Sequence, residues 1–313
     1  MSDAHEERVV ENVPELDLTG MTSEEELAAI SQIRNVAVVL VRESLAGALH
    51  RVPMSDVASV VAVPDGVRPH VQTGSIVMGG EGLAPPDGDQ LALVVTGALV
   101  LSTPVEAVTY RQVIVTGLVL APEGSEAALG RGLTRVTGSV QYYRYAEGQR
   151  IRTMSGQLTV SADTLANEGG STDDVLVVSG QVVVTGAVTT VGFQQIIAAG
   201  QVILPRAGES VLSSHLTVDG QVIWYDGEPR LFTGRERLDA DFLTWIEDPV
   251  TLIVIGRLDV AEGVTPELLR AKLAEIALVG RIVAPPELLG VLRFLCREKH
   301  GTITTEQGDG DDG

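Results

Sequence analysis

Three pairs of neighbouring carboxylates are the residues with the clearest potential for chemistry. They are Asp239 with Asp241, Glu247 with Asp248, and Asp173 with Asp174. Carboxylates clustered in a groove serve as acid and base in polysaccharide-cleaving enzymes, several of which are β-helix proteins. The first two pairs, however, begin and end a predicted helix, where an acid at the start stabilises the helix without catalysis. The third pair follows two glycines, which is typical of a turn.

Other chemical motifs are not found in the sequence. The five histidines, at positions 5, 50, 70, 215 and 300, do not have the spacing of metal ligands, and the single Cys296 excludes an internal disulfide. No P-loop, dinucleotide-binding or nucleophile-elbow motif stands between a predicted strand and helix, and the glycine-rich run 79–82 lacks a lysine. We therefore predict no catalytic residue, no cofactor and no metal ion, and expect that the protein is not an enzyme.

The few aromatic residues form two groups. They are Tyr142, Tyr143 and Tyr145 on one predicted strand, and Trp224 with Tyr225 on another. Alternation along the first strand places Tyr143 and Tyr145 on the solvent side. One interpretation is a small contact patch, and the other is packing between the corners of the fold.

The elements that would position any site are dominated by aliphatic residues and carry a strong negative charge. The chain has 313 residues, 22 Lys and Arg against 42 Asp and Glu, and a net charge of −20. This charge argues against nucleic acid and anionic lipid as partners, because both require a basic face. The acidic start predicts no signal peptide, and no apolar run is long enough to span a membrane. We therefore expect a cytoplasmic protein.

A phrase of the form apolar, x, Gly, x, apolar, x, apolar recurs along the chain. Its glycines lie 18 to 24 residues apart from Gly97 to Gly220, after which two more copies follow. The glycines are Gly97, Gly117, Gly138, Gly156, Gly180, Gly200, Gly220, Gly256 and Gly280, with a weaker copy at Gly74. The position two residues after the glycine is always a branched aliphatic, as at Val182, Val202 and Val222. This alternation predicts β-strands with one buried face.

Regular recurrence without long helices predicts a parallel β-solenoid, or β-helix, of about ten or more coils of roughly 20–24 residues. A β-sandwich is the alternative. In four successive repeats the glycine is followed by Gln157, Gln181, Gln201 and Gln221. Stacked strands lie about 4.8 Å apart, so these side chains could form an amide ladder. Outward-facing, solvated glutamines are the other interpretation.

The two ends resemble each other, because residues 22–49 align without gaps on residues 265–292. The sequence of each end predicts a helix, a strand and a second helix, with Thr22 and Thr265 as the N-caps of the first helices. Another helix is predicted near residues 239–247. These units either cap the solenoid or stack on the end of another copy. The predicted segments are an acidic disordered tail at 1–20, an end unit at 21–60, the solenoid core at 61–235, an end unit at 236–301 and a second disordered tail at 302–313.

The glycine-centred phrases VSGQVVV and IAAGQVIL, within stacked aliphatic strands flanked by charged tails, resemble bactofilins, the polymer-forming bacterial β-solenoid proteins. The resemblance is architectural and covers residues 74–225, and no functional residue is carried over from it. It implies a non-enzymatic, cytoplasmic scaffold that assembles with itself into filaments or larger assemblies. Two alternatives are a capped monomeric adaptor for an unidentified protein partner and a carbohydrate-active β-helix enzyme.

Overall fold

The computed structural model describes residues 8–305, which form two compact units divided between Ile151 and Arg152. The fold is mainly β, and each of the five sheets contains parallel strand pairs, as predicted. The strands do not form one continuous solenoid. They form five short sheets, one of three strands and four of four, which make up four separate stacks. We call each layer of a stack a rung.

The N-terminal stack has three rungs. Its elements are β1 (Arg8–Asp17), α1 (Glu24–Ala28), β2 (Ile30–Arg42), α2 (Ala46–Leu49) and β3 (Met54–Val63). Residues 8–17, predicted to belong to a disordered tail, therefore form a strand, because their apolar positions pair with those of β2. The predictions for residues 1–7 and 306–313 lie outside the described residues. Helix α1 is capped by Ser23 and not by Thr22.

The second stack has four rungs and completes the first unit. Its elements are β4 (Arg68–Met78), β5 (Leu91–Leu101), β6 (Gln112–Pro122), α3 (Glu126–Gly132) and β7 (Arg135–Tyr143). The repeated glycines lie directly opposite one another, from Gly74 through Gly97 and Gly117 to Gly138. Each strand bends at this column, where Gly97 has a φ of +135° that only glycine adopts readily.

The third stack has four rungs of two strands each. Its elements are β8 (Ile151–Met154), β9 (Gln157–Ser161), β10 (Val175–Val178), β11 (Gln181–Thr185), β12 (Gln195–Ala198), β13 (Gln201–Pro205), α4 (Glu209–Leu212), β14 (Leu216–Val218) and β15 (Gln221–Tyr225). The first strands of the four rungs form one sheet and the second strands another. The repeated glycine lies at the corner between the two strands of each rung.

The C-terminal stack again has four long strands. Its elements are β16 (Pro229–Leu238), α5 (Ala240–Thr244), β17 (Val250–Val260), α6 (Pro266–Lys272), β18 (Leu273–Val283), α7 (Leu289–Leu295) and β19 (Cys296–Thr304). Its glycine column runs through Gly234, Gly256, Gly280 and Gly301. Gly234 and Gly301 were missed in the sequence, because their phrases carry charged residues at the flanking positions.

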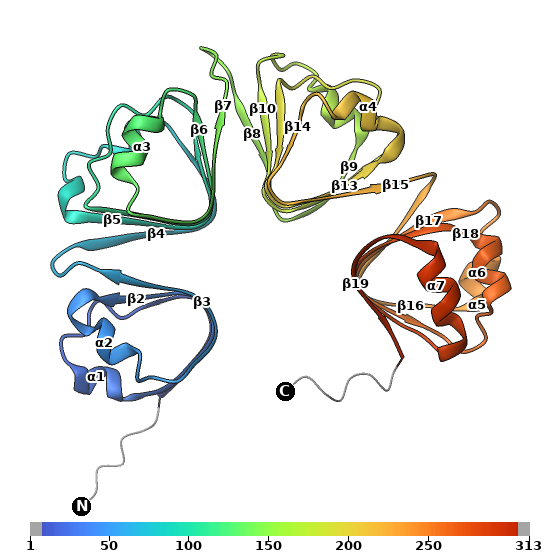
Figure 1. Cartoon of the computed structure of the whole chain (residues 1–313), viewed down its shortest axis with the longest axis horizontal. Coiled ribbons are helices and arrows are strands. Elements are labelled where there is room, and N and C mark those ends of the chain that lie inside the picture. The colour runs from blue at the N-terminus through green and yellow to red at the C-terminus, as the bar shows by residue number, and fades with distance from the viewer. Residues whose placement is uncertain (1–7, 306–313) are drawn as a thin grey trace, which may run out of the picture. The chain divides into compact units, whose positions relative to one another are not determined.

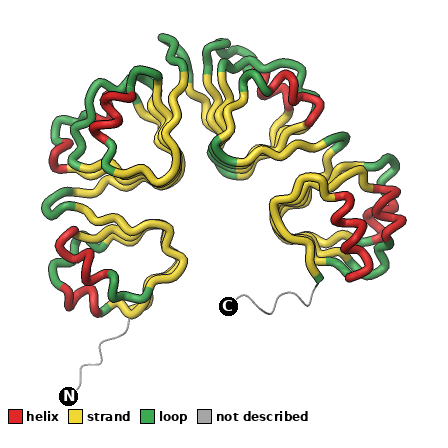
Figure 2. The backbone as a smooth tube through the Cα atoms, viewed as in Figure 1, coloured by secondary structure: helices red, strands yellow, loops and turns green. Residues whose placement is uncertain are grey.

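In every stack the strands form a bent wall, and loops with short helices close its other side (Figure 1; Figure 2). Loop residues complete the core of the stack. In the second stack, for example, Leu83, Val105 and Leu129 join the strand residues Leu99 and Val119. Further 3-10 helices lie at Glu43–Leu45, Gly80–Leu83, Gly88–Gln90, Ala162–Ala166, Arg206–Gly208 and Pro286–Leu288. Helical segments are therefore present in all four stacks and do not distinguish the two ends of the chain.

Strands in the middle of a stack also bury their outer faces. Within the first unit, Val38 and Leu40 of β2 pack against Ala92 and Val94 of β5. Within the second unit, outward residues of the third and C-terminal stacks form a similar cluster. Each unit is therefore held together by apolar contact between its two stacks, which explains the nearly continuous apolar runs of the inner strands.

A tyrosine completes the backbone ladder at one end of the second stack. Val100 lies opposite Leu120, so the next residue, Leu101, lies opposite Ala121. In this parallel ladder a carbonyl accepts from the N–H of the residue after its partner. The Leu101 carbonyl therefore faces Pro122, which has no N–H to donate. The Tyr143 hydroxyl donates to this carbonyl at 2.9 Å. Tyr143 is fully buried, so the prediction that it faces solvent is wrong.

The third stack repeats this arrangement. Val183 lies opposite Ile203, so the carbonyl of Val184 faces Pro205. The Tyr225 hydroxyl donates to that carbonyl at 2.9 Å, and burial raises the pKa of this tyrosine to about 12. In both stacks the proline stands on the last rung but one and the tyrosine on the last. The tyrosine thus replaces a donor that the ladder lacks.

We expect Tyr225→Phe to lower the free energy of unfolding by about 1–3 kcal/mol, because it leaves the buried Val184 carbonyl without a donor. Urea denaturation measures this difference. Tyr142→Phe on β7 is the control, because the Tyr142 hydroxyl does not take part in this arrangement. Equal denaturation midpoints for wild type and Tyr225→Phe would contradict this account of the ladder.

Candidate interaction surface

The strands at the two edges of each stack are the most prominent candidate surface. Within the described residues, the first and last strands of each sheet have a neighbouring strand on one side only. Their other side presents backbone N–H and C=O groups that another strand could pair with. Edges of this kind are usually covered, shortened or charged, because they invite association.

The exposed apolar residues of the described chain lie mostly on these edge strands. On the edges are Val9, Val77, Val140, Leu158, Val218 and Leu231, of which Val218 is 51% exposed. The equivalent positions of inner rungs are buried, since Val182 and Val202 of the same column as Leu158 are almost inaccessible. The predicted buried column is therefore buried only within each stack, and it opens to solvent at the edges.

The four glutamines lie opposite one another in one column of the third stack. The Gln181 amide donates to Gln201, and Gln201 donates to Gln221. Gln221 in turn bonds the imidazole of His300 on β19. The ladder thus links rungs of the third stack and reaches the C-terminal stack of the same unit.

Two members of the carboxylate pairs considered for catalysis, Asp239 and Asp174, have structural roles. Asp239 caps α5 by accepting from the Phe242 N–H at 2.8 Å. Asp174 is buried, and its carboxylate accepts from the Ser171 N–H at 3.1 Å within a turn. Glu247 and Asp248 are exposed after α5, as is Asp241 in its first turn. Their geometry adds no support to an acid–base mechanism.

Metal and ligand sites have little basis in the described part of the chain. Among residues 8–305, no three His, Cys, Asp or Glu side chains lie together as a metal site requires. An apolar cavity inside the third stack has a volume of about 10 Å³, room for one water molecule at most. Burial raises the pKa of the Cys296 thiol to about 11, which keeps it protonated and a poor nucleophile.

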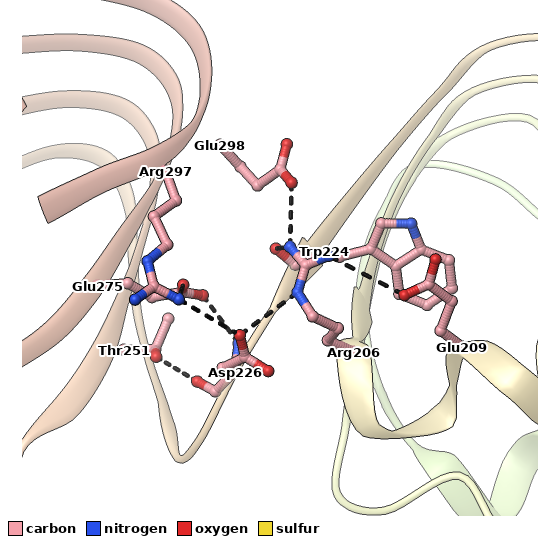
Figure 3. A network of polar contacts seen from close by, with 8 residues as sticks. All are labelled: Arg206, Glu209, Trp224, Asp226, Thr251, Glu275, Arg297 and Glu298. Carbon is pink, nitrogen blue, oxygen red and sulfur yellow. Dashed lines mark hydrogen bonds and ion pairs between the residues drawn. The ribbon is translucent and has the colours of Figure 1, made fainter.

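A network of charged residues surrounds the turn between β15 and β16 in the second unit (Figure 3). Arg206 bonds Glu298 at 3.0 Å and pairs with Asp226 at 3.3 Å. The Asp226 N–H donates to Glu275 at 2.8 Å, and the Thr251 hydroxyl donates to the Asp226 carbonyl. The network thus fixes the turn against strands of the C-terminal stack.

Glu275 is the buried member of this network, with a side chain only 2% exposed. Burial raises its pKa, while the hydrogen bond from Asp226 and the charges of Arg297 and Arg206 act in the opposite direction. Arg297 lies 3.8 Å from the carboxylate. The groups that stabilise the Glu275 carboxylate are Asp226 of the turn, Arg297 of the neighbouring strand β19 and Arg206 of a 3-10 helix, which indicates a structural role.

The raised pKa of Glu275 predicts a specific pH dependence. Because the native carboxyl binds its proton more tightly than the unfolded one, stability from this group falls as pH rises from about 4.3 through the native pKa. We expect the stability of Glu275→Gln not to fall in this pH range, because glutamine has no proton to release but still accepts the hydrogen bond from the Asp226 N–H. Unfolding free energies measured between pH 4 and pH 8 should therefore diverge between wild type and variant, with exposed Glu262→Gln as control. If the unfolding free energies of wild type and Glu275→Gln changed in parallel with pH, Glu275 would not be the source of the pH dependence.

Comparison of the chain with protein-family models, curated protein sequences and solved structures finds no match. Within residues 8–305, none of the helices has the length and apolar character needed to cross a bilayer. The open strand edges are the feature of the described chain that bears most directly on its function.

Proposed function

We propose that the chain is a non-enzymatic structural protein, a cytoplasmic scaffold that assembles with itself into filaments or larger regular assemblies. The observation that carries this proposal is that the stacks expose strand edges bearing apolar side chains. Strand addition satisfies the unpaired backbone groups and covers these side chains at the same time. The strong net negative charge opposes indiscriminate association, so that only well-matched contacts form.

The structure suggests a different contact from the one considered on sequence. The helix-containing ends of the chain are not special, since every stack has such segments. The edges of the stacks replace them as the proposed interface. A likeness to bactofilins is part of the same proposal, because bactofilins are β-solenoid proteins that form polymers.

Light scattering and negative-stain electron microscopy of the purified full chain test the proposal. We expect assemblies that grow with protein concentration, and we expect Val77→Lys with Val140→Lys to prevent them by charging two strand edges. Trp245→Lys with Phe294→Lys is the matched control, because these side chains are exposed on helical segments and not on strand edges. Wild-type protein that stays monomeric at all concentrations would refute self-assembly.

One observation favours a second candidate function, that of an adaptor for another protein. Trp245, at the end of α5, is 86% exposed, and Phe294 of α7 is also exposed with Arg270 stacked 5.4 Å over its ring. Exposed aromatic and arginine side chains are typical of protein interfaces. If the aromatic variants lose a binding partner while assembly is unchanged, the adaptor function gains support.

A further inference from the structure

The glutamine column of the third stack ends on a histidine of the C-terminal stack. Gln181, Gln201 and Gln221 lie opposite one another on successive rungs. The Nε2 group of Gln181 donates to Gln201, and that of Gln201 donates to Gln221. The last donor, Gln221, bonds the imidazole Nδ1 of His300 on β19. His300 therefore supplies the acceptor that a further rung would otherwise supply.

The ladder has a direction, because Gln201 and Gln221 both accept through Oε1 and donate through Nε2 toward the C-terminal stack. A neutral imidazole has one nitrogen that accepts and one that carries a proton. An amide nitrogen only donates. In the bond from Gln221, the Nδ1 atom of His300 is therefore the accepting nitrogen, and the proton is on Nε2.

Protonation of His300 removes the acceptor on which this direction depends. Both nitrogens of an imidazolium donate, so Nδ1 no longer accepts from Gln221. The Oε1 atom of Gln221 accepts from the imidazolium once it faces His300. A half-turn of the amide about χ3 brings it there, and this torsion of glutamine is broad and roughly two-fold.

The exchange passes along the column, because each amide has one donor side and one acceptor side. When Gln221 turns its oxygen to His300, its Nε2 group faces Gln201, which turns its own oxygen to accept. Gln181 follows for the same reason. Its Nε2 group then points to Gln157 of the first rung, which lies opposite it. Within residues 8–305 the Gln157 side chain has no hydrogen bond, so the reversed ladder gains an acceptor at this end.

We infer that His300 is a pH-sensitive switch for the direction of the glutamine ladder. Histidine changes its charge between about pH 5 and pH 8. Neutral His300 permits the direction seen in the structure, whereas charged His300 permits only the reverse. Gln157 is exposed on β9, an edge strand, so the charge of His300 determines which polar group of the column faces this edge. The switch goes beyond the proposed function and does not require self-assembly.

Charged groups on the neighbouring elements define the surroundings of His300. They are Glu275 and Arg281 on β18, Arg293 on α7, Arg297, Glu298 and Lys299 on β19, Asp219 and Asp226 beside β15, and Arg206, which bonds Glu298. Arginine and lysine keep their charge throughout this pH range. Burial raises the pKa of Glu275, so its titration must be separated from that of His300.

Nuclear magnetic resonance of the side-chain amides tests the switch. The full chain is labelled with ¹⁵N at glutamine and studied at a concentration at which it is monomeric. Between pH 8 and pH 5 we expect the signals of Gln181, Gln201 and Gln221 to shift with one common midpoint. The ring signals of His300 should show the same midpoint. The signal of Gln90, which is exposed in the first unit, should not shift.

Two variants separate the ladder from other effects of pH. In His300→Gln, the column still ends on an amide that accepts from Gln221, but this amide does not titrate. The three glutamine signals should therefore stop shifting, although Glu275 is unchanged. In Gln201→Met, the middle of the ladder lacks an amide. Gln221 should still respond to His300 in this variant, and Gln181 should no longer respond.

Each outcome supports or overturns the switch, whether or not the chain assembles. Loss of all three shifts in His300→Gln, with loss of only the Gln181 response in Gln201→Met, supports it. Shifts confined to Gln221 in the wild type would show that charged His300 turns into solvent without reversing the ladder, and would overturn it. Equal shifts in wild type and His300→Gln would do the same, as would a Gln181 response that persists in Gln201→Met.

Discussion

Gly117→Ala should abolish the folded state of the first unit or reduce its stability by more than about 4 kcal/mol, a loss confined to the severest single substitutions. Gly117 has a φ of +130°, outside the range that alanine adopts, and an added Cβ overlaps the Gly97 carbonyl. Both costs fall in the middle of the second stack, where the inner strands leave no room for the backbone to shift.

Gly130→Ala is the control for this prediction. Gly130 lies in helix α3 of the same stack, and an added Cβ meets nothing within 4 Å. Alanine in a helix is more stable than glycine by up to about 1 kcal/mol, so this variant should be as stable as wild type or more stable. Urea denaturation followed by circular dichroism compares the two. Similar midpoints for both variants would mean that the glycine column is not tightly packed.

The second large effect is expected for Val202→Asp, which should lose about 3–5 kcal/mol or fail to fold. Val202 is only 3% exposed and lies between Val182 and Val222 in the core of the third stack. An aspartate there is a buried charge without a partner, or must bind a proton at a large cost.

Val218→Asp provides the matched control in the same stack. Val218 is exposed on β14, an edge strand, so the new carboxylate stays in water and the melting temperature should change little. The comparison is made at a concentration at which both proteins are monomeric. Unchanged melting of Val202→Asp would contradict the buried column.

The strand register was predictable from the sequence, and the ends of the stacks were not. Gly97, Gly117 and Gly138 align in space as they align in the chain, because a repeat of nearly constant length returns each strand to the same position. A stack ends, however, wherever a short turn starts a new one. The turn around Gly227, between β15 and β16, resembles any other corner in sequence.

One signal of the stack ends is present in the sequence at two places. A proline five residues after the glycine, followed by a tyrosine at the same position of the next repeat, marks the last two rungs at Pro122 and Tyr143, and again at Pro205 and Tyr225. Its meaning depends on a hydrogen bond between rungs, which no single repeat reveals.

The candidate surface could not be located from sequence for a related reason. Val140 and Leu158 follow the same phrase as Val119 and Val182, yet the first two are exposed and the last two buried. The difference is set by whether another rung covers the strand, which is a property of the whole stack. In the strands of the N-terminal stack the residues with positive φ are Asn12, Asn35 and Asp56, so the glycine phrase does not mark these strands.

Electron cryo-microscopy of the assembled protein tests the central claim most directly, through the repeat along the strand-stacking direction. Contact through the open strand edges predicts that the strand spacing of about 4.8 Å continues across the junction between copies. Particles that remain discrete monomers, or assemblies in which the strand ladders are interrupted between copies, would contradict assembly through the open strand edges.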